Sequence, residues 1–240
     1  MTLLADFGNT RVKAAVIENG RLRQVYCGPV LLDKLSDSVS GMGIDGGIWC
    51  SVHPLDPSVQ EWMTVHGMEQ LTASTPIPLS NAYSSPQTLG MDRLAAAVGA
   101  WFMQPGHDLL VVDAGTAITY DFISADGVYH GGNIAPGIEL RFKSLYEHTG
   151  VLPLVRKEGA IPMFGIDTET AIRSGVIKGI RHELDGYLTE LTSIYPSLLV
   201  FLTGGDAESF DIKAKSTTFA VPDLVLRGLA RISEYNEKGI

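Results

Sequence analysis

The chain has 240 residues, of which 45% are hydrophobic and 19% are charged, and its formal net charge is −9. This composition is typical of a folded globular protein and excludes an intrinsically disordered chain. The negative charge argues against a nucleic-acid-binding surface, which would need a basic face.

The sequence shows no pattern typical of a zinc centre or of membrane insertion. The two cysteines, Cys27 and Cys50, form no CxxC pair and no Cys/His cluster, so a zinc site is not expected. No run approaches the roughly 20 apolar residues of a membrane helix. The amino terminus lacks the features of a signal peptide. We therefore expect a cytoplasmic protein with reduced thiols.

The first part of the chain is predicted to be rich in β-structure. Strands are expected at residues 3–5, 12–18, 21–26, 46–52 and within 70–79. The pair Asn19-Gly20 is a strong signal for a two-residue hairpin turn. Residues 41–46 spell G-x-G-x-x-G, but they precede a strand instead of opening a helix. The dinucleotide-binding interpretation is rejected on that context.

The remainder alternates helices and strands. An Ala-rich helix is expected from Asp92, at the natural N-cap position, to about residue 102. A long helix is expected to start near Asp167, because apolar residues follow it at helical spacing. The other expected elements are strands at 118–123, 127–130 and 198–202, a glycine-proline loop at 131–137, and helices at 138–148 and 222–235. This order predicts an α/β fold built from two repeats.

Two segments share one pattern, in which an apolar strand runs into Asp-x-Gly and polar residues and then back into apolar sequence. They are LLADFGNTRVKAAV at residues 3–16 and LVVDAGTAITYDF at residues 110–122. Glycine lets the backbone approach a ligand, and nearby N–H groups and hydroxyls can hold phosphate oxygens while the Asp holds a cation. Either copy alone is equally well an ordinary hairpin turn. The two copies together predict a duplicated nucleotide clamp.

The paired clamps resemble the two phosphate loops of the actin, hexokinase and Hsp70 ATPase superfamily. The resemblance implies a duplicated ribonuclease H-like fold, with two half-domains around an ATP cleft. Residues 1–105 would form the N-terminal half, which carries the first phosphate loop and the acceptor-side motif. Residues 106–240 would form the C-terminal half, which carries the second phosphate loop and an adenosine loop.

The stretch YSSPQTLGMDR at residues 83–93 narrows this resemblance to the type III pantothenate kinases. Further blocks agree in order and spacing: DFGNT at 6–10, DAGTA at 113–117, GGNIAPG at 131–137, Asp167-Thr168, and TGGD at 203–206. Two positions depart from the family pattern. Ala114 stands where a bulkier residue is usual, and Asp167 stands where Asn is common, which adds a negative charge beside Thr168.

The resemblance implies ATP-dependent phosphorylation of the terminal hydroxyl of pantothenate, the first step towards coenzyme A. Phosphoryl transfer needs positioning, charge neutralisation and a base for the hydroxyl proton. Asp92 matches the family's base, although the residues alone favour a helix cap. Arg93 matches a contact to pantothenate, and a guanidinium suits its carboxylate. The substrate-binding residues implied are Tyr83, Gly90, Met91, Asp92, Arg93 and Thr168, the last near a homodimer interface.

The same resemblance assigns the nucleotide and cation contacts. The ATP-binding residues implied are Asp6, Phe7, Gly8, Asn9, Thr10, Arg11, Val12, Lys13 and Thr116. Asp6 is expected to face Mg²⁺ through water. Asp113 matches the position that holds a monovalent cation, K⁺ or NH₄⁺. Lys13 is also compatible with a solvated side chain, and His130 is expected to be structural.

Three alternatives remain. The first is a kinase of the same superfamily for another small metabolite, which the short length and the GMDR block disfavour. The second is a non-catalytic accessory or regulatory homologue, which the retained Asp6, Asp92, Arg93 and Asp113 disfavour. The third is an actin-like ATPase, which would not need Tyr83 with Arg93. Dependence of ATP turnover on pantothenate discriminates among them.

Overall fold

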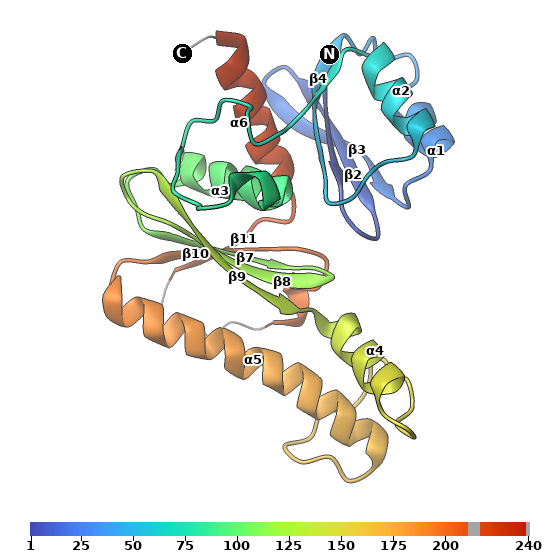
Figure 1. Cartoon of the computed structure of the whole chain (residues 1–240), viewed down its shortest axis with the longest axis vertical. Coiled ribbons are helices and arrows are strands. Elements are labelled where there is room, and N and C mark those ends of the chain that lie inside the picture. Colours follow the sequence, from blue (N-terminus) through green and yellow to red (C-terminus); the bar gives the residue numbers. More distant parts are fainter. Residues whose placement is uncertain (211–216, 239–240) are drawn as a thin grey trace. The chain divides into compact units, whose positions relative to one another are not determined.

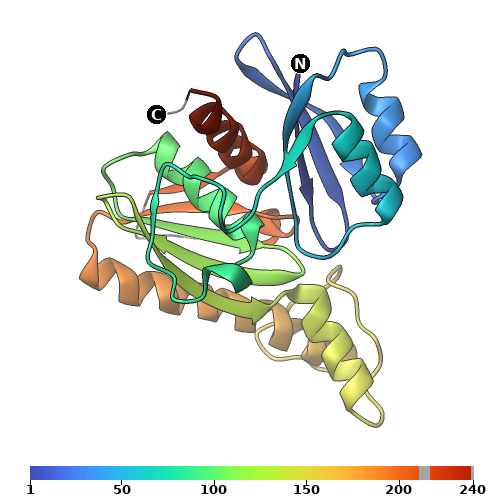
Figure 2. The same ribbon diagram turned by 45° about the horizontal axis from the view of Figure 1, so that its top comes forward.

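The described residues form two β-sheets that share one strand order (Figures 1 and 2). The computed structural model describes residues 1–210 and 217–238. One sheet has the order β3-β2-β1-β4-β5, and the other has β11-β10-β7-β8-β9-β6. Apart from the edge strand β6, the second order repeats the first, since β9-β8-β7-β10-β11 corresponds to β3-β2-β1-β4-β5. The repeat confirms the predicted duplicated α/β fold.

Strands and helices alternate along the chain, and the sequence patterns did not predict α1, α2 or β6. The strands are β1 (Thr2–Phe7), β2 (Val12–Glu18), β3 (Arg21–Gly28), β4 (Gly46–Ser51), β5 (Met68–Gln70), β6 (Ser80–Asn81), β7 (Leu109–Ala114), β8 (Ala117–Ile123), β9 (Val128–Pro136), β10 (Leu199–Thr203) and β11 (Thr218–Ala220). The α-helices are α1 (Leu32–Val39), α2 (Pro57–Val65), α3 (Met91–Met103), α4 (Ile138–His148), α5 (Thr168–Ile194) and α6 (Leu224–Lys238). Short 3₁₀ helices occupy Pro86–Thr88 and Ala207–Ser209.

Each sheet is organised around an apolar first strand. β1 pairs with β2 in antiparallel and with β4 in parallel orientation. Leu3, Leu4 and Ala5 of β1 are all fully buried, as is typical of a strand covered on both faces. β7 holds the same place in the second sheet, where its residues 109–112 are buried and it pairs in parallel with β10. The polar turns that follow β1 and β7 are therefore carried by the best-buried strands.

The described chain groups into two compact units. The first comprises Met1–Gly106, Asp121–Gly131 and Asp223–Ile240, and the second comprises His107–Tyr120 and Gly132–Pro222. The last helix, α6, belongs to the first unit because it packs along α3. The boundary between half-domains at residues 105 and 106 stays a prediction from the repeated motifs.

Two sequence predictions are wrong in detail. Residues 71–79 form no strand, since β5 ends at Gln70 and β6 begins at Ser80. The stretch 131–137 is not a loop over most of its length, because β9 continues to Pro136. Gly131, with φ of 95°, absorbs a backbone conformation within the strand that other residues rarely adopt. Glycine and proline there suggested a loop, but strand pairing overrides their local preference.

The start of α3 also differs from the expectation. The helix begins at Met91 and its N-cap is Gly90, which makes no side-chain hydrogen bond. Asp92 lies one residue inside the helix, where its Oδ1 accepts from the N–H of Arg93 at 2.9 Å. The carboxylate therefore satisfies a first-turn donor from within the helix instead of capping it from outside.

Glycines allow α3 and α6 to approach closely. A Cβ on Gly228 of α6 would lie 1.7 Å from the carbonyl oxygen of Ala95, and one on Gly99 of α3 would lie 2.6 Å from that of Leu224. Because backbone atoms are in the way, no side-chain adjustment would relieve either contact. This packing anchors α3, whose first turn carries Asp92 and Arg93.

We predict that Gly228→Ala destabilises the protein, because the added methyl group collides with the backbone of α3. Overpacking of a tight contact costs about 3 kcal/mol. Gly186→Ala in α5 is the matched control, since its Cβ would meet nothing within 4 Å and a helical Ala gains up to about 1 kcal/mol over Gly. Thermal unfolding followed by circular dichroism measures both, and a Gly228→Ala protein as stable as the control would contradict the prediction.

Candidate active site

The turn between β1 and β2 is tight and closed by the backbone. The N–H of Gly8 donates to the carbonyl oxygen of Arg11 at 3.0 Å. A Cβ on Gly8 would lie 3.2 Å from that same oxygen, so glycine favours this closure. Asp6 and Lys13 are paired neighbours on the two strands that lead into and out of the turn. A carboxylate and an ammonium group thus flank a loop of backbone donors, as the sequence predicts for a phosphate site.

The side chains of this first turn divide by exposure. Asn9, Thr10 and Arg11 are exposed, and Asp6 and Lys13 are partly buried. Phe7 and Val12 are fully buried in the hydrophobic core, so any part they take in nucleotide binding is through their backbone. The predicted ATP-binding stretch 6–13 is therefore a hairpin with an exposed polar turn, and its Phe7 and Val12 side chains belong to the core.

Cys50 lies beside Asp6 of the first turn and is also affected by the charge of Asp92 in the GMDR block. It lies beside Asp6 in the parallel pairing of β1 and β4, and its Sγ donates to Asp6 Oδ1 at 3.6 Å. Burial raises the pKa of the Cys50 thiol well above its usual value, and the nearby charges of Asp6 and Asp92 act in the same direction. The charge of Asp92 therefore acts on the same buried thiol that contacts Asp6, although the two aspartates are far apart in sequence.

The local backbone fixes the position of the Asp92 carboxylate. A Cβ on Gly90 would lie 2.5 Å from Asp92 Oδ1, so the glycine of the GMDR block leaves room for this side chain. Burial raises the pKa of Asp92, and the negative charge of Asp121 adds to the effect, while the N–H of Arg93 opposes it. A carboxylate with a raised pKa is a better proton acceptor than a solvated one, as a general base requires.

Arg93 and Tyr83 lie together beside Asp92 in the first unit. The guanidinium of Arg93 is buried and forms an ion pair with Asp121 of β8, with 2.6 Å between Nη2 and Oδ1. Its Cζ lies over the ring of Tyr83, 5.9 Å from the centroid. Tyr83 in turn fits against Gly131, where a Cβ would approach its ring to 2.6 Å. The structure thus brings together three predicted site residues from a loop and a helix.

Sequence reasoning missed three residues of this cluster: Cys50, Asp121 and Tyr129. The hydroxyl of Tyr129 donates to Asp121 Oδ1 at 2.7 Å. The available signal was a carboxylate in the middle of the apolar strand sequence AITYDFI, since a buried charge needs a partner. Nothing in the sequence indicates which residue that partner is.

In the second unit, three loops meet at the turn between β7 and β8. The N–H of Gly115 donates to the carbonyl oxygen of Ala117, that of Gly137 to Thr116, and that of Asp206 to Ala114, at 3.0, 2.9 and 2.9 Å. A Cβ on Gly137 would lie 2.2 Å from the carbonyl oxygen of Gly115. The blocks DAGTA, GGNIAPG and TGGD, separate in sequence, are therefore packed backbone to backbone.

The predicted ligand contacts of this unit lie on the same turn. Asp113, at the end of β7, is partly buried and paired with Thr203 of β10, and Thr116 is exposed. Asp206 forms an ion pair with Lys157, with 2.6 Å between Oδ1 and Nζ. This pair ties the TGGD loop to the segment that leads into α5.

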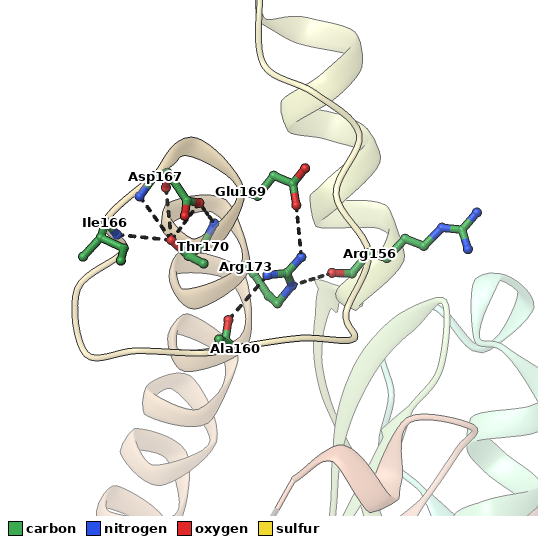
Figure 3. A network of polar contacts seen from close by, with 7 residues as sticks. All are labelled: Arg156, Ala160, Ile166, Asp167, Glu169, Thr170 and Arg173. Atoms are coloured by element: carbon green, nitrogen blue, oxygen red, sulfur yellow. Dashed lines mark hydrogen bonds and ion pairs between the residues drawn. The ribbon is translucent and has the colours of Figure 1, made fainter.

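Thr168 is exposed at the first position of α5. Figure 3 shows the helix cap that Asp167 and Thr170 form beside it. The N–H of Thr170 donates to Asp167 Oδ1 at 2.8 Å, and the N–H of Asp167 donates back to Thr170 Oγ1 at 3.3 Å. These hydrogen bonds form a capping box and lower the pKa of Asp167. The aspartate that replaces the family's usual asparagine thus stabilises the helix start, which also favours negative charge.

Figure 3 also shows how the segment before α5 is held. The buried Arg173 donates through Nε to the carbonyl oxygen of Arg156 at 2.9 Å and forms an ion pair with Glu169 at 3.6 Å. Ser174 Oγ donates to the carbonyl oxygen of Pro162 at 2.9 Å. The segment of residues 156–167 is therefore held against α5 by polar contacts.

No three Asp, Glu, His or Cys side chains within residues 1–210 and 217–238 gather into a cluster that would hold a metal ion unaided. A single carboxylate such as Asp6 suits Mg²⁺ that keeps most of its waters and is shared with phosphate oxygens. Over the same described ranges, none of the helices has the length and apolar character needed to cross a membrane.

The comparison with protein families bears directly on this arrangement. The family model for type III pantothenate kinase matches residues 2–190. The chain belongs to the type III pantothenate kinase family. It is 50% identical to the type III pantothenate kinase of Phocaeicola vulgatus over 99% of this chain and 100% of that protein. The enzyme of the same name from Bacteroides fragilis is 46% identical, over 98% of each chain.

Solved structures agree in fold. A protein described as a Baf family transcriptional activator from Campylobacter jejuni is similar with a TM-score of 0.63, at 23% identity over 98% of this chain and 99% of that chain. The ROK hexokinase of Thermus thermophilus is similar with a TM-score of 0.54, at 14% identity over 96% of this chain and 97% of that one. These likenesses show the fold that this family shares with sugar kinases.

We predict that Asp92→Asn keeps or raises the stability of the fold at neutral pH. The folded-state pKa of Asp92 lies above its unfolded-state value. The stability that this group contributes to the fold is therefore fully present below the unfolded-state pKa and is lost as the pH rises through the folded-state pKa. The amide carries no charge and avoids that loss.

Urea unfolding at neutral pH measures the effect. The opposite sign is expected for Asp56→Asn, because Asp56 caps α2 and its hydrogen bonds with Ser58 lower its pKa. A marked destabilisation by Asp92→Asn would show that the ionised carboxylate supports the fold.

Proposed function

We propose that this member of the family transfers the γ-phosphoryl group of ATP to the terminal hydroxyl of pantothenate, with Asp92 as the general base. The hydroxyl oxygen bonds to the γ-phosphorus, the bond from that phosphorus to the bridging oxygen of ADP breaks, and Asp92 accepts the hydroxyl proton. The product, 4′-phosphopantothenate, is the first intermediate towards coenzyme A.

One observation carries the assignment of the base. Asp92 is held in the first turn of α3, with a raised pKa, close to the same buried thiol that contacts Asp6 of the first phosphate loop. A proton acceptor thus lies near a phosphate-binding turn, as phosphoryl transfer to a hydroxyl requires. Tyr83 and Arg93 adjoin it and supply an aromatic surface and a guanidinium for the substrate.

The nucleotide contacts are proposed on the two glycine turns. Backbone donors near Gly8, with Asn9, Thr10 and Lys13, would hold phosphate oxygens, and Thr116 would do so from the second turn. Bound Mg²⁺ offsets the negative charge of the phosphates, and Asp6 would hold it through water. Asp113 would hold K⁺ or NH₄⁺ with oxygen ligands. The free state of Cys27 and Cys50 supports a place in the reducing cytoplasm.

The deciding test is ADP release from ATP and Mg²⁺, with and without pantothenate, in potassium and in sodium buffer. ADP that forms only with pantothenate supports the substrate, and faster release in potassium supports the cation site. Asp113→Asn is expected to remove the preference for potassium, while the exposed Asp185→Asn keeps it. ADP release that ignores pantothenate would overturn the proposed acceptor.

We predict that Asp92→Asn lowers turnover about 100-fold or more, the usual contribution of a positioned base. In the wild type, kcat/KM should fall on the acid side at a pH above the ordinary aspartate range, because burial raises the pKa of Asp92. Asp33→Asn, an exposed position on α1, serves as the control. Near-normal turnover by Asp92→Asn would reject the base.

Homodimer formation is proposed from an apolar surface on the second unit. Val151, Phe164 and Ile166 expose 93%, 80% and 91% of their surface, and Leu140, Tyr146 and Met163 are also exposed. These residues lie on α4 and on the segment between α4 and α5, and exposed apolar patches mark interaction sites. The contacts of Arg173 and Ser174 described above fix the backbone of this segment, so little ordering would be needed on association. Thr168 immediately follows it.

We predict that Ile166→Glu converts the dimer to a monomer, because a buried charge without a partner is costly at an interface. Val65→Glu on α2 is the control, since Val65 is 75% exposed but lies in the first unit. Light scattering after gel filtration at one fixed concentration measures the mass of each. A dimer that survives Ile166→Glu would place the interface elsewhere.

A further inference from the structure

The most deeply buried charges of the first unit form one polar cluster under the start of α3. Arg93 is 7% exposed and Asp121 is 1% exposed. Arg93 Nε lies 3.1 and 3.2 Å from the two carboxylate oxygens of Asp121, and Nη2 lies 2.6 Å from Oδ1. The hydroxyl of Tyr129 donates to the same Oδ1 at 2.7 Å. The carboxylate on β8 therefore receives hydrogen bonds from one residue of the neighbouring strand β9 and from one residue of α3.

We propose that Asp121, supported by Tyr129, is a positioning residue that holds the Arg93 guanidinium in the orientation needed for the carboxylate of the substrate. The proposal rests on the proposed function, in which Arg93 contacts pantothenate. Asp121 acts through Arg93 and has no contact of its own with the reacting atoms.

The hydrogen-bonding pattern leaves a defined edge of the guanidinium for a ligand. A guanidinium has five N–H donors in a fixed plane. Asp121 accepts along the edge formed by Nε and Nη2. The other edge, formed by Nη1 and the second hydrogen of Nη2, is not used by Asp121 and has the spacing of a carboxylate, and the side chain of Tyr83 also hydrogen-bonds the guanidinium. Rotation of the guanidinium would break the contacts with Asp121, so the orientation of that edge is fixed.

The ring of Tyr83 restricts the movement of the Arg93 guanidinium from another side. Arg93 Cζ lies 5.9 Å from the Tyr83 centroid, and Gly131 leaves the space that this ring fills. The backbone N–H of Tyr83 donates to the side chain of Asn81 at 3.0 Å. Arg93 is thus held by a carboxylate on β8 and an aromatic ring on a supported loop.

A contribution to the stability of the fold does not by itself explain the buried ion pair of Arg93 and Asp121. Replacing a buried ion pair by apolar residues of similar volume is often neutral or stabilising. An arginine that must present donors to an anion has a different requirement, because an oriented guanidinium loses less entropy when the ligand binds. The hydrogen bond from Tyr129 fits this role, since it fixes the carboxylate that fixes Arg93.

The test compares the KM for pantothenate with the KM for ATP in four variants of the full chain. Asp121→Asn keeps the shape but removes the charge, and Tyr129→Phe removes only the hydroxyl. Tyr120→Phe is the matched control, because its buried hydroxyl donates to Glu183 instead of Asp121. Arg93→Gln tests the residue through which Asp121 acts.

We expect Tyr129→Phe to raise the KM for pantothenate about 5-fold and Asp121→Asn about 10-fold or more, the scale of losing a hydrogen bond to a charged group. The KM for ATP should stay unchanged, and Tyr120→Phe should change neither. Pantothenol, in which a CH₂OH group replaces the carboxylate, is the second probe. Its KM should be insensitive to Asp121→Asn and Tyr129→Phe.

The outcomes separate the two levels of the proposal. If Arg93→Gln raises the KM for pantothenate but Tyr129→Phe and Asp121→Asn do not, the positioning role is overturned and the assignment of Arg93 stands. If Arg93→Gln leaves that KM unchanged, the assignment of Arg93 fails and the positioning role with it. Equal rises for pantothenate, pantothenol and ATP would mean a general distortion and would also overturn it. Should Asp121→Asn fail to fold, the isosteric Tyr129→Phe decides.

Discussion

The arrangement of the residues proposed to bind pantothenate depends on the burial of charge in the first turn of α3. Asp92 and Arg93 are adjacent in sequence, with Asp92 partly buried and Arg93 buried, but their surroundings differ. Arg93 meets Asp121 at hydrogen-bonding distance, and these contacts outweigh the burial that opposes its charge, so the pKa of the guanidinium is raised. Among the residues that the structure describes, Asp92 forms no such ion pair, and burial raises the pKa of its carboxylate. Arg93 is thereby kept charged and oriented, and the raised pKa of Asp92 makes its carboxylate a better proton acceptor.

Close backbone packing through glycine serves the same end in both units. Gly228 and Gly99 bring α6 against α3, so that the helix start cannot drift. Gly137 and Gly204 bring two loops against the turn between β7 and β8, where a Cβ at either position would approach backbone oxygens to 2.2 and 2.4 Å. In each case the glycine acts by the absence of a side chain. A site built from loops gains rigidity from such contacts, since backbone atoms have no alternative rotamers.

Much of this could be predicted from the sequence, and the rest could not for identifiable reasons. The repeated Asp-x-Gly turns and the apolar strands before them predicted the duplicated fold, because strand burial and turn chemistry are local properties. The helix over residues 138–148 is correct at both ends. The wrong prediction at 131–137 arose because the pairing of β9 overrides the local preference of glycine and proline. The partnership of Arg93 with Asp121 depends on which strand passes beneath α3, and it is invisible to any pattern of neighbouring residues.

Cys50 gives the active site a chemical reporter of its own. Its thiol is buried with a raised pKa, and thiolates rather than thiols react with alkylating and oxidising agents, whereas Cys27 is exposed. In the folded protein, such reagents should therefore modify the thiol of Cys27 quickly and leave that of Cys50 intact. The slow modification of Cys50 would then measure how often the strands around Asp6 open to solvent. A substrate that closes or stiffens this region would be detected as protection of a single sulfur atom, without any label introduced by mutation.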